Sequence, residues 1–166
     1  MTLTPFFKGY KPFDIWVIDL IVGLPPGSDG QTICLVCICS FSKFVVARAL
    51  KDKSSQSITN AFYTAIIAEY GVPTALRCDN GTEFRGVFAQ LLKMFKIYRY
   101  PATAYYPQAL GQVEVTNKTI KTMLRKFDSA SDGLFWDEAL PDIVLGIRTS
   151  VSAAHGFTPY ELVFKQ

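Results

Sequence analysis

The stretch DIWVIDLIVGL, residues 14–24, decides the fold, because it is an apolar strand with an acid in its middle. It is rich in β-branched residues and stops at the turn cluster PPGSDG, so it predicts a strand. Asp19 interrupts the apolar run, and a carboxylate among apolar neighbours is costly unless it faces water, is paired or binds a metal. Alternation along the strand permits a solvent-facing Asp19, so both an ordinary and a functional role stay open here.

The stretches that follow extend this strand into a sheet. TICLVCICS (32–40) and FVVARAL (44–50) predict two more strands, and their short connections indicate an antiparallel meander. Over residues 54–71 the apolar residues recur at helical spacing, which predicts a helix that ends at Gly71. A strand returns at TALRC (74–78), and the order strand, helix, strand implies a right-handed crossover into a parallel pair.

The second half of the chain alternates helices with one more strand. It begins with a helix over 86–95, a fifth strand at KIYRYP (96–101) and a polar-aromatic loop over 102–111. A long helix follows from near Gly111 to about Asp128. The last two helices lie within 135–150, bent or interrupted at Pro141, and at 158–164. The last begins with a capping box, Thr158 with Glu161 three residues later, which gives Glu161 a structural role. The prediction is one α/β domain over 1–166, with about 1–12 as an extended lead-in. It has a five-stranded mixed sheet, three antiparallel then two parallel strands, and helices on both faces.

The composition excludes several classes of protein. Of 166 residues, 49% are hydrophobic and 19% charged, which argues against disorder, and the net charge of +3 is compatible with nucleic acid. No apolar run approaches the roughly 18 residues of a membrane span, so we expect no membrane partner. The single histidine, His155, excludes a two-histidine zinc site. Cys34 and Cys37 should point to opposite faces of their strand, as buried reduced thiols of an intracellular protein.

Two further acids lie where a site would form. Asp79 ends the fourth strand, at the edge where open α/β sheets bind ligands. The Asn-Gly pair after it predicts a turn, because glycine tolerates a positive φ. Glu114 lies in the first turn of the long helix. Taken singly, Asp79 is best interpreted as a solvated turn residue and Glu114 as a helix-dipole acid. If the first and fourth strands are neighbours, Asp19 and Asp79 become adjacent, and clustered carboxylates suit a pair of magnesium ions.

The long helix also carries a polar stripe. The stripe consists of Glu114, Asn117, Lys118, Lys121 and Arg125, which follow helical spacing. We expect it on the side of the helix opposite the apolar stripe of Val113, Ile120, Leu124 and Phe127. A carboxylate at the start of a row of cations is a layout for an enzyme acting on a phosphate backbone. A solvated helix face is the other interpretation.

An ordered set of motifs resembles a known family. The set is WVIDLIVGLP, FSKFVVA, YGVP, CDNGTEF, AYYPQALGQVEVTNKTIK and GFTPYELVF, and it covers residues from about Trp16 to Phe164. It resembles the catalytic core of integrases from retroviruses and gypsy-type LTR retrotransposons, a family named for Asp, Asp and Glu at about the interval of 35 residues between Asp79 and Glu114. The resemblance implies a ribonuclease H-like fold.

The resemblance also implies roles. Asp19, Asp79 and Glu114 would be the catalytic ligands of Mg²⁺ or Mn²⁺ in a two-metal polynucleotidyl transferase that trims DNA 3′ ends and joins them to target DNA. The implied DNA contacts are Asn117, Lys118, Lys121, Arg125, Tyr105, Tyr106 and Gln108, and Tyr105 to Gly111 would form a mobile loop hinged at Pro107 and Gly111. The implied partners are element and target DNA in the nucleus and at least one further copy of the chain, with no small-molecule substrate.

Some positions depart from the family pattern. Tyr106 stands where the gypsy-type family often has His, and Val115 where it usually has Arg. These departures keep a second hypothesis open, an inactive domesticated integrase fold that serves as a DNA- or protein-binding module. A bacterial insertion-sequence transposase fits the later motifs less well. Full integrases also carry an N-terminal zinc domain and a C-terminal DNA-binding domain, so we expect this chain to represent the core alone.

Overall fold

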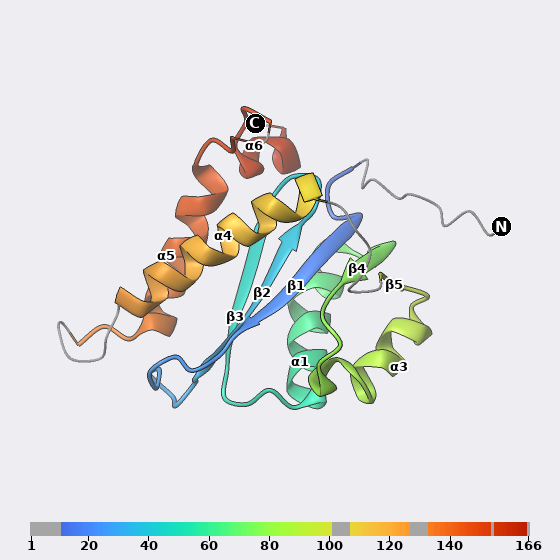
Figure 1. The fold of residues 1–166 in the computed structure, drawn as a ribbon, viewed down its shortest axis with the longest axis horizontal. Coiled ribbons are helices and arrows are strands. Elements are labelled where there is room, and N and C mark those ends of the chain that lie inside the picture. The colour runs from blue at the N-terminus through green and yellow to red at the C-terminus, as the bar shows by residue number, and fades with distance from the viewer. Residues whose placement is uncertain (1–10, 101–106, 127–132, 154, 166) are drawn as a thin grey trace.

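The fold is seen in a computed structural model that describes residues 11–100, 107–126, 133–153 and 155–165, with the backbone alone over 107–112. One mixed sheet organises these residues (Figure 1). Its strands are β1 (Ile15–Ile21), β2 (Ile33–Cys39), β3 (Val45–Leu50), β4 (Ala75–Arg77) and β5 (Tyr98–Tyr100). Their order in the sheet is β3-β2-β1-β4-β5.

The pairing confirms the predicted topology. β1 pairs antiparallel with β2, and β2 pairs antiparallel with β3. β4 pairs parallel with both β1 and β5. The central strand is therefore the one that carries Asp19, and its neighbour on the parallel side is the strand that leads to Asp79.

Helices connect and cover the strands. A continuous helical segment is made of α1 (Ser55–Phe62), a π-helical turn η1 (Tyr63–Ile67) and α2 (Ala68–Tyr70), and Gly71 at φ 90° ends it. The other helical elements are the 3₁₀ turn η2 (Thr82–Phe84), α3 (Val87–Met94), α4 (Pro107–Lys126), α5 (Trp136–Thr149) and α6 (Pro159–Phe164). None of the helices in the described ranges is both long and apolar enough to cross a membrane.

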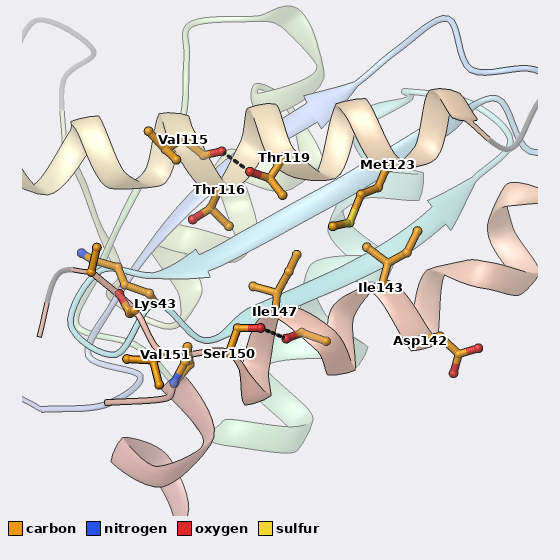
Figure 2. Close-up of a pocket in the computed structure, with 14 residues that line it drawn as sticks. Lys43, Val115, Thr116, Thr119, Met123, Asp142, Ile143, Ile147, Ser150 and Val151 are labelled. Carbon is orange, nitrogen blue, oxygen red and sulfur yellow. Dashed lines mark hydrogen bonds between the residues drawn. The ribbon is translucent and has the colours of Figure 1, made fainter. Parts of the chain in front are cut away.

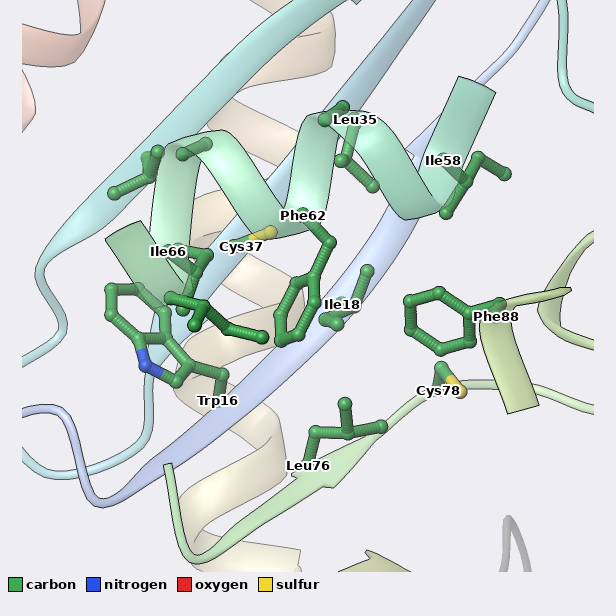
Figure 3. Packing of buried hydrophobic residues seen from close by; sticks show 14 of the residues in the cluster. Trp16, Ile18, Leu35, Cys37, Ile58, Phe62, Ile66, Leu76, Cys78 and Phe88 are labelled. Carbon is green, nitrogen blue, oxygen red and sulfur yellow. The ribbon is translucent and has the colours of Figure 1, made fainter. Parts of the chain in front are cut away.

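The sheet separates two apolar cores, one on each face. Trp16 and Ile18 of β1 point to the face covered by α1, η1 and α3, where Phe62 and Phe88 stack edge to face with ring centroids 5.6 Å apart (Figure 3). Ile21 points to the opposite face, which α4 and α5 cover (Figure 1). Every residue of β2 is buried, because this strand has helices over both of its faces.

The helix α4 begins earlier than the sequence predicts. Residues 107–111 are helical, so Gly111 lies inside α4 and is not the end of a loop in this structure. Proline suits the first helical position, because the N–H that it lacks would have no partner inside the helix. The expected lead-in residues 1–10, the loop residues 102–106 and the expected helix end at Asp128 lie outside the described residues.

The helix α5 continues through Pro141, so it is not interrupted there, and the alternative of a bend at Pro141 stays a prediction. A proline inside a helix costs about 3 kcal/mol, because its ring clashes with the preceding turn and one hydrogen bond is lost. Burial of Trp136, Ala139, Leu140 and Val144 against the sheet offsets that cost. The predicted capping box of α6 is confirmed: the Glu161 N–H donates to Thr158 Oγ1 at 3.0 Å, and the Thr158 N–H donates to Glu161 Oε2 at 2.8 Å.

All four cysteines are buried free thiols, as predicted for Cys34 and Cys37, and they lie on both faces of the sheet. Cys34 packs in the core under α4 and α5, whereas Cys37 and Cys39 pack in the core under α1. Burial raises the pKa of Cys34 to about 12 and that of Cys78 to about 11, and it also raises the pKa of Cys37. Such thiols are poor nucleophiles at neutral pH.

We therefore expect Ellman's reagent to modify none of the four thiols of the native protein at pH 8 in the time that it modifies all four in guanidinium chloride. The absorbance of the released thiolate measures both reactions. Rapid modification of even one native thiol would contradict the burial of the four cysteine side chains.

Candidate active site

Asp19 lies on the α4 face of the central strand. Its neighbour Ile18 is buried in the core under α1, so alternation along β1 turns Asp19 to the other side. There the Asn117 side-chain amide donates to Asp19 Oδ2 at 2.7 Å, and the Leu20 N–H donates to Asp19 Oδ1 at 2.9 Å. Asp19 is thus a half-buried, hydrogen-bonded carboxylate, not the solvent-facing residue that its strand position also permitted.

Asp79 stands beside Asp19, as the sequence predicted. The parallel register pairs Val17 with Arg77; two residues further along the chain, Asp19 is still in β1 and Asp79 lies just beyond the end of β4. The pKa of Asp19 reflects their proximity. Burial is the main cause that raises this pKa, and the charge of Asp79 raises it further, while the Leu20 N–H and the Lys121 ammonium act in the opposite direction. The net effect is a raised pKa of Asp19, because burial and the charge of Asp79 both disfavour its ionised form.

The turn after Asp79 is built differently from the prediction. Gly81 has φ −55°, so the positive φ expected from the Asn-Gly pair is not used. Instead, the Gly81 N–H donates to Asp79 Oδ1 at 2.8 Å, and the chain enters η2 directly afterwards. The acid itself forms the turn, because an Asp side chain can accept a hydrogen bond from the backbone two residues on.

Arg99 of β5 also holds this turn, and sequence reasoning missed it. Its guanidinium donates to the carbonyl oxygen of Asp79 and, at 2.9 Å, to that of Phe84. A single arginine in a three-residue strand belongs to no motif, so only the spatial neighbourhood of β4 and β5 identifies it.

Glu114 does not join the two aspartates in this structure. Its side chain is exposed, and within the described ranges no group of three or more His, Cys, Asp and Glu side chains is placed to hold a metal ion. The reason is the orientation of α4, whose inward stripe is Val113, Asn117, Ile120 and Leu124. Glu114 is about 100° around the helix from Val113, so Asn117 rather than Glu114 faces Asp19. The role of Glu114 as a metal ligand stays a prediction.

The polar stripe of α4 flanks the apolar stripe and is not opposite to it. Asn117 and Lys121 are half-buried and lie close to Asp19, one through a hydrogen bond and the other through its charge. Lys118 and Arg125 are exposed, and they lie further around the helix. Of the remaining predicted DNA contacts, Tyr105 and Tyr106 lie outside the described residues, and Gln108 is described in its backbone alone.

The donors around Asp19 suit a hard divalent cation. Asp19 and Asp79 supply carboxylate oxygens, and the Asn117 Oδ1 atom is buried without a hydrogen-bond partner among the described residues. Carboxylate and amide oxygens are ligands that Mg²⁺ and Mn²⁺ accept. An unpaired buried oxygen beside two carboxylates fits a site that a cation completes.

A cavity of about 590 Å³ lies on the other flank of α4 and is separate from the acids. Figure 2 shows Val115, Thr119 and Met123 of α4 facing Ile143 and Ile147 of α5 across it, with Lys43 at one end and Asp142 at the other. Asp19, Asp79 and Glu114 do not line it. The cavity therefore belongs to the seam between the two helices and is distinct from the candidate site at Asp19 and Asp79.

The raised pKa of Asp19 predicts how stability depends on pH. Because folding raises this pKa above its ordinary value of 3.8, the ionised carboxylate destabilises the native state at neutral pH, and that cost disappears as the pH falls to about 4. In buffer without divalent cations, Asp19→Asn should raise the melting temperature by about 1–3 °C at pH 7, and the gain should shrink towards pH 4. Differential scanning calorimetry across this range measures it.

Asp52→Asn is a control for which we expect the opposite change in melting temperature. Hydrogen bonds from Ser54 and Ser57 lower the pKa of Asp52, so this substitution should destabilise the protein at pH 7 and less so at low pH. A lower melting temperature for Asp19→Asn at pH 7 would contradict the assignment of Asp19 as a carboxylate that burial and Asp79 destabilise.

Comparison with known proteins gives the site its context. The model of the integrase core domain family matches residues 9–107. The Retrovirus-related Pol polyprotein from transposon 412 of Drosophila melanogaster is 33% identical over 153 residues, which are 92% of this chain and 12% of the polyprotein. The Pol polyprotein of Radiation murine leukemia virus (strain Kaplan) is 33% identical over 158 residues, covering 95% of this chain and 27% of the polyprotein. The chain thus spans about a quarter or less of the length of these relatives.

A solved structure has the same fold. The HTLV-2 integrase catalytic core domain in complex with magnesium, in its trimeric form, superposes with a TM-score of 0.73 at 24% identity and covers 93% of this chain and 99% of that one. The order of the five strands and the helices on both faces agree with this ribonuclease H-like architecture. By sequence and by fold, this chain belongs to the integrase core domain family of retroviruses and LTR retrotransposons.

Proposed function

We propose that this chain is the catalytic core of an integrase that trims DNA 3′ ends and joins them to target DNA with the help of Mg²⁺ or Mn²⁺. The observation that carries the proposal is the pair Asp19 and Asp79, brought side by side by the parallel strands β1 and β4 under the polar flank of α4. Membership of the integrase core family supports it.

Asp19, Asp79 and Glu114 are the proposed ligands of the cations. The HTLV-2 integrase core was solved in complex with magnesium, which supports this choice of metal. When bound, the cations would polarise the scissile phosphate and lower the pKa of the attacking water or 3′-hydroxyl. Asn117 holds the Asp19 carboxylate on the α4 side, and the Gly81 N–H fixes one oxygen of Asp79. Glu114 lies one turn of α4 before Asn117, on the side of the helix that water reaches.

The cationic flank of α4 is the proposed surface for the DNA backbone. Lys121 is close enough to Asp19 to influence its ionisation, and Lys118 and Arg125 continue the row in solvent. A phosphate placed against this row would lie beside the two aspartates, so the same helix would orient the DNA end and flank the reacting phosphorus. Tyr105, Tyr106 and Gln108 are proposed as further contacts, in a nuclear assembly of several copies of the chain.

One observation favours a second function. Because Glu114 is exposed and the three carboxylates are not assembled, the fold could instead serve as an inactive DNA- or protein-binding module. The two functions differ in whether divalent cations support any cutting or joining of DNA.

A disintegration assay tests the proposal. This reaction reverses strand transfer on a short branched duplex labelled at its 5′ end. With Mn²⁺ the wild type should release the joined strand, and Asp79→Asn and Glu114→Gln should each lower the rate by more than about 100-fold. Loss of a ligand should cost more than the 10–100-fold that loss of a residue supporting a ligand costs. Gel electrophoresis of the products measures the rate.

Glu69→Gln is the matched control, because Glu69 is an exposed acid on α2, which belongs to the helical layer over the opposite face of the sheet. Its activity should equal that of the wild type. Wild-type activity in Glu114→Gln would remove Glu114 from the site, and an inactive wild type that still binds DNA would favour the binding module.

The cationic flank makes a separate prediction about salt. Each phosphate contact releases counterions, so the logarithm of the DNA affinity falls with the logarithm of the salt concentration. Lys121→Ala should reduce that slope by roughly 1 and weaken binding to all sequences alike. Fluorescence anisotropy between 50 and 200 mM NaCl measures it.

Lys93→Ala is the control, because Lys93 is an exposed lysine of α3, on the opposite face of the sheet. This variant should keep the wild-type slope. Equal slopes for Lys121→Ala, Lys93→Ala and the wild type would remove α4 from the proposed DNA surface.

A further inference from the structure

The backbone around Asp79 lacks the support that a longer strand would provide. β4 ends at Arg77, two residues before Asp79, so the pairing with β1 and β5 does not extend to the acid. The acid is exposed, and the only contact found for its carboxylate among the described residues is the Gly81 N–H at 2.8 Å. A carboxylate that is to bind a cation needs a fixed backbone, and the sheet does not supply it here.

Arg99 supplies that support from the neighbouring strand. Leu76 of β4 pairs with Arg99 of β5, which places the arginine at the start of the turn. One guanidinium nitrogen donates to the Asp79 carbonyl, and another donates to the Phe84 carbonyl at 2.9 Å. The two carbonyls stand at the two ends of the segment 79–84, so a single side chain spans the turn.

The far end of this segment is anchored in the core. Phe84 is 1% exposed, and its ring lies edge to face with that of Phe88 at 5.5 Å between centroids. By bonding both carbonyls, Arg99 links the exposed end of the turn, Asp79, to a residue that the core immobilises. A planar guanidinium can hold two separated acceptors at once, whereas a lysine ammonium offers a single point of attachment.

The hydrogen bonds of Arg99 go to the backbone of Asp79 and leave its carboxylate available. Were the guanidinium paired with the carboxylate, it would compete with a cation for the same oxygens. We infer that Arg99 is a positioning residue: it holds the Asp79 carboxylate in place for a divalent cation without neutralising it. The inference rests on the proposed function, because it takes Asp79 to be a cation ligand.

Mn²⁺ binding tests the inference directly. Titration of free Mn²⁺, followed by electron paramagnetic resonance, gives the affinity of the wild type, Arg99→Gln and Arg99→Lys without any reaction. We expect the dissociation constant to rise about 10–100-fold in both variants, the range found for residues that support metal ligands. In the disintegration assay, the Mn²⁺ concentration for half-maximal rate should rise by the same factor, while the rate at saturating Mn²⁺ stays within about threefold of the wild type.

Arg85→Gln is the matched control. Arg85 donates to the Asn80 carbonyl of the same turn at 3.2 Å, but it is exposed and does not bond Asp79 among the described residues. Its Mn²⁺ affinity should change less than twofold. Melting temperatures in EDTA show which variants are folded, and Arg99→Lys, which keeps the charge and one donor group, decides the question if Arg99→Gln unfolds.

The outcomes separate the inference from the proposed function. If the wild type binds Mn²⁺ and folded Arg99→Lys binds it equally well, the inference is overturned and the proposed function stands. A wild type that binds no Mn²⁺ overturns both. A purely structural role would lower the melting temperature in EDTA and leave the Mn²⁺ affinity of the folded protein unchanged, which also overturns the inference.

Discussion

The parallel pairing of β1 with β4 is the constraint on which the candidate site depends. It holds Val17 level with Arg77, and so it brings Asp19 and Asp79 together although 60 residues separate them in the chain. Two carboxylates at one sheet edge repel each other, and the burial of Asp19 adds to that cost. The large apolar cores on both faces of the sheet stabilise the pairing despite this repulsion. A carboxyl group whose pKa is raised by burial and by a neighbouring charge marks a candidate functional site.

The helix α4 relates this site to the rest of the molecule. Its buried stripe anchors it on the sheet, one flank brings Asn117 and Lys121 to Asp19, and the other flank borders the cavity shared with α5. The rotation of α4 about its own axis therefore decides which polar side chain reaches the acids. In this structure that side chain is Asn117, and Glu114 remains in solvent.

The turn after β4 is held by side chains and not by pairing in the sheet. Asp79 forms it through its own carboxylate, Arg99 closes it by bonding two backbone carbonyls, and Phe84 anchors it in the core. Ser55 of α1 extends the support, since it bonds the Arg85 carbonyl and accepts from the Phe88 N–H at 3.1 Å. The loop is thus held by its own Asp79 and Phe84 and by two side chains that are distant in sequence, Arg99 of β5 and Ser55 of α1.

The sequence by itself determined the antiparallel meander of β1 to β3, the entry of a parallel strand after the first helix and the two-sided burial of the cysteines, because alternation, helical period and chain connectivity are local patterns. It left open whether β1 and β4 are neighbours, and the tertiary structure decided that they are, which brings Asp19 and Asp79 together. Only the tertiary structure decided that α4 begins at Pro107, that α5 passes through Pro141 and that Gly81 needs no positive φ. It alone decided that Asn117 faces Asp19 and that Arg99 holds Asp79. The physical reason is that helix rotation and side-chain reach depend on packing against distant residues, which no local pattern encodes.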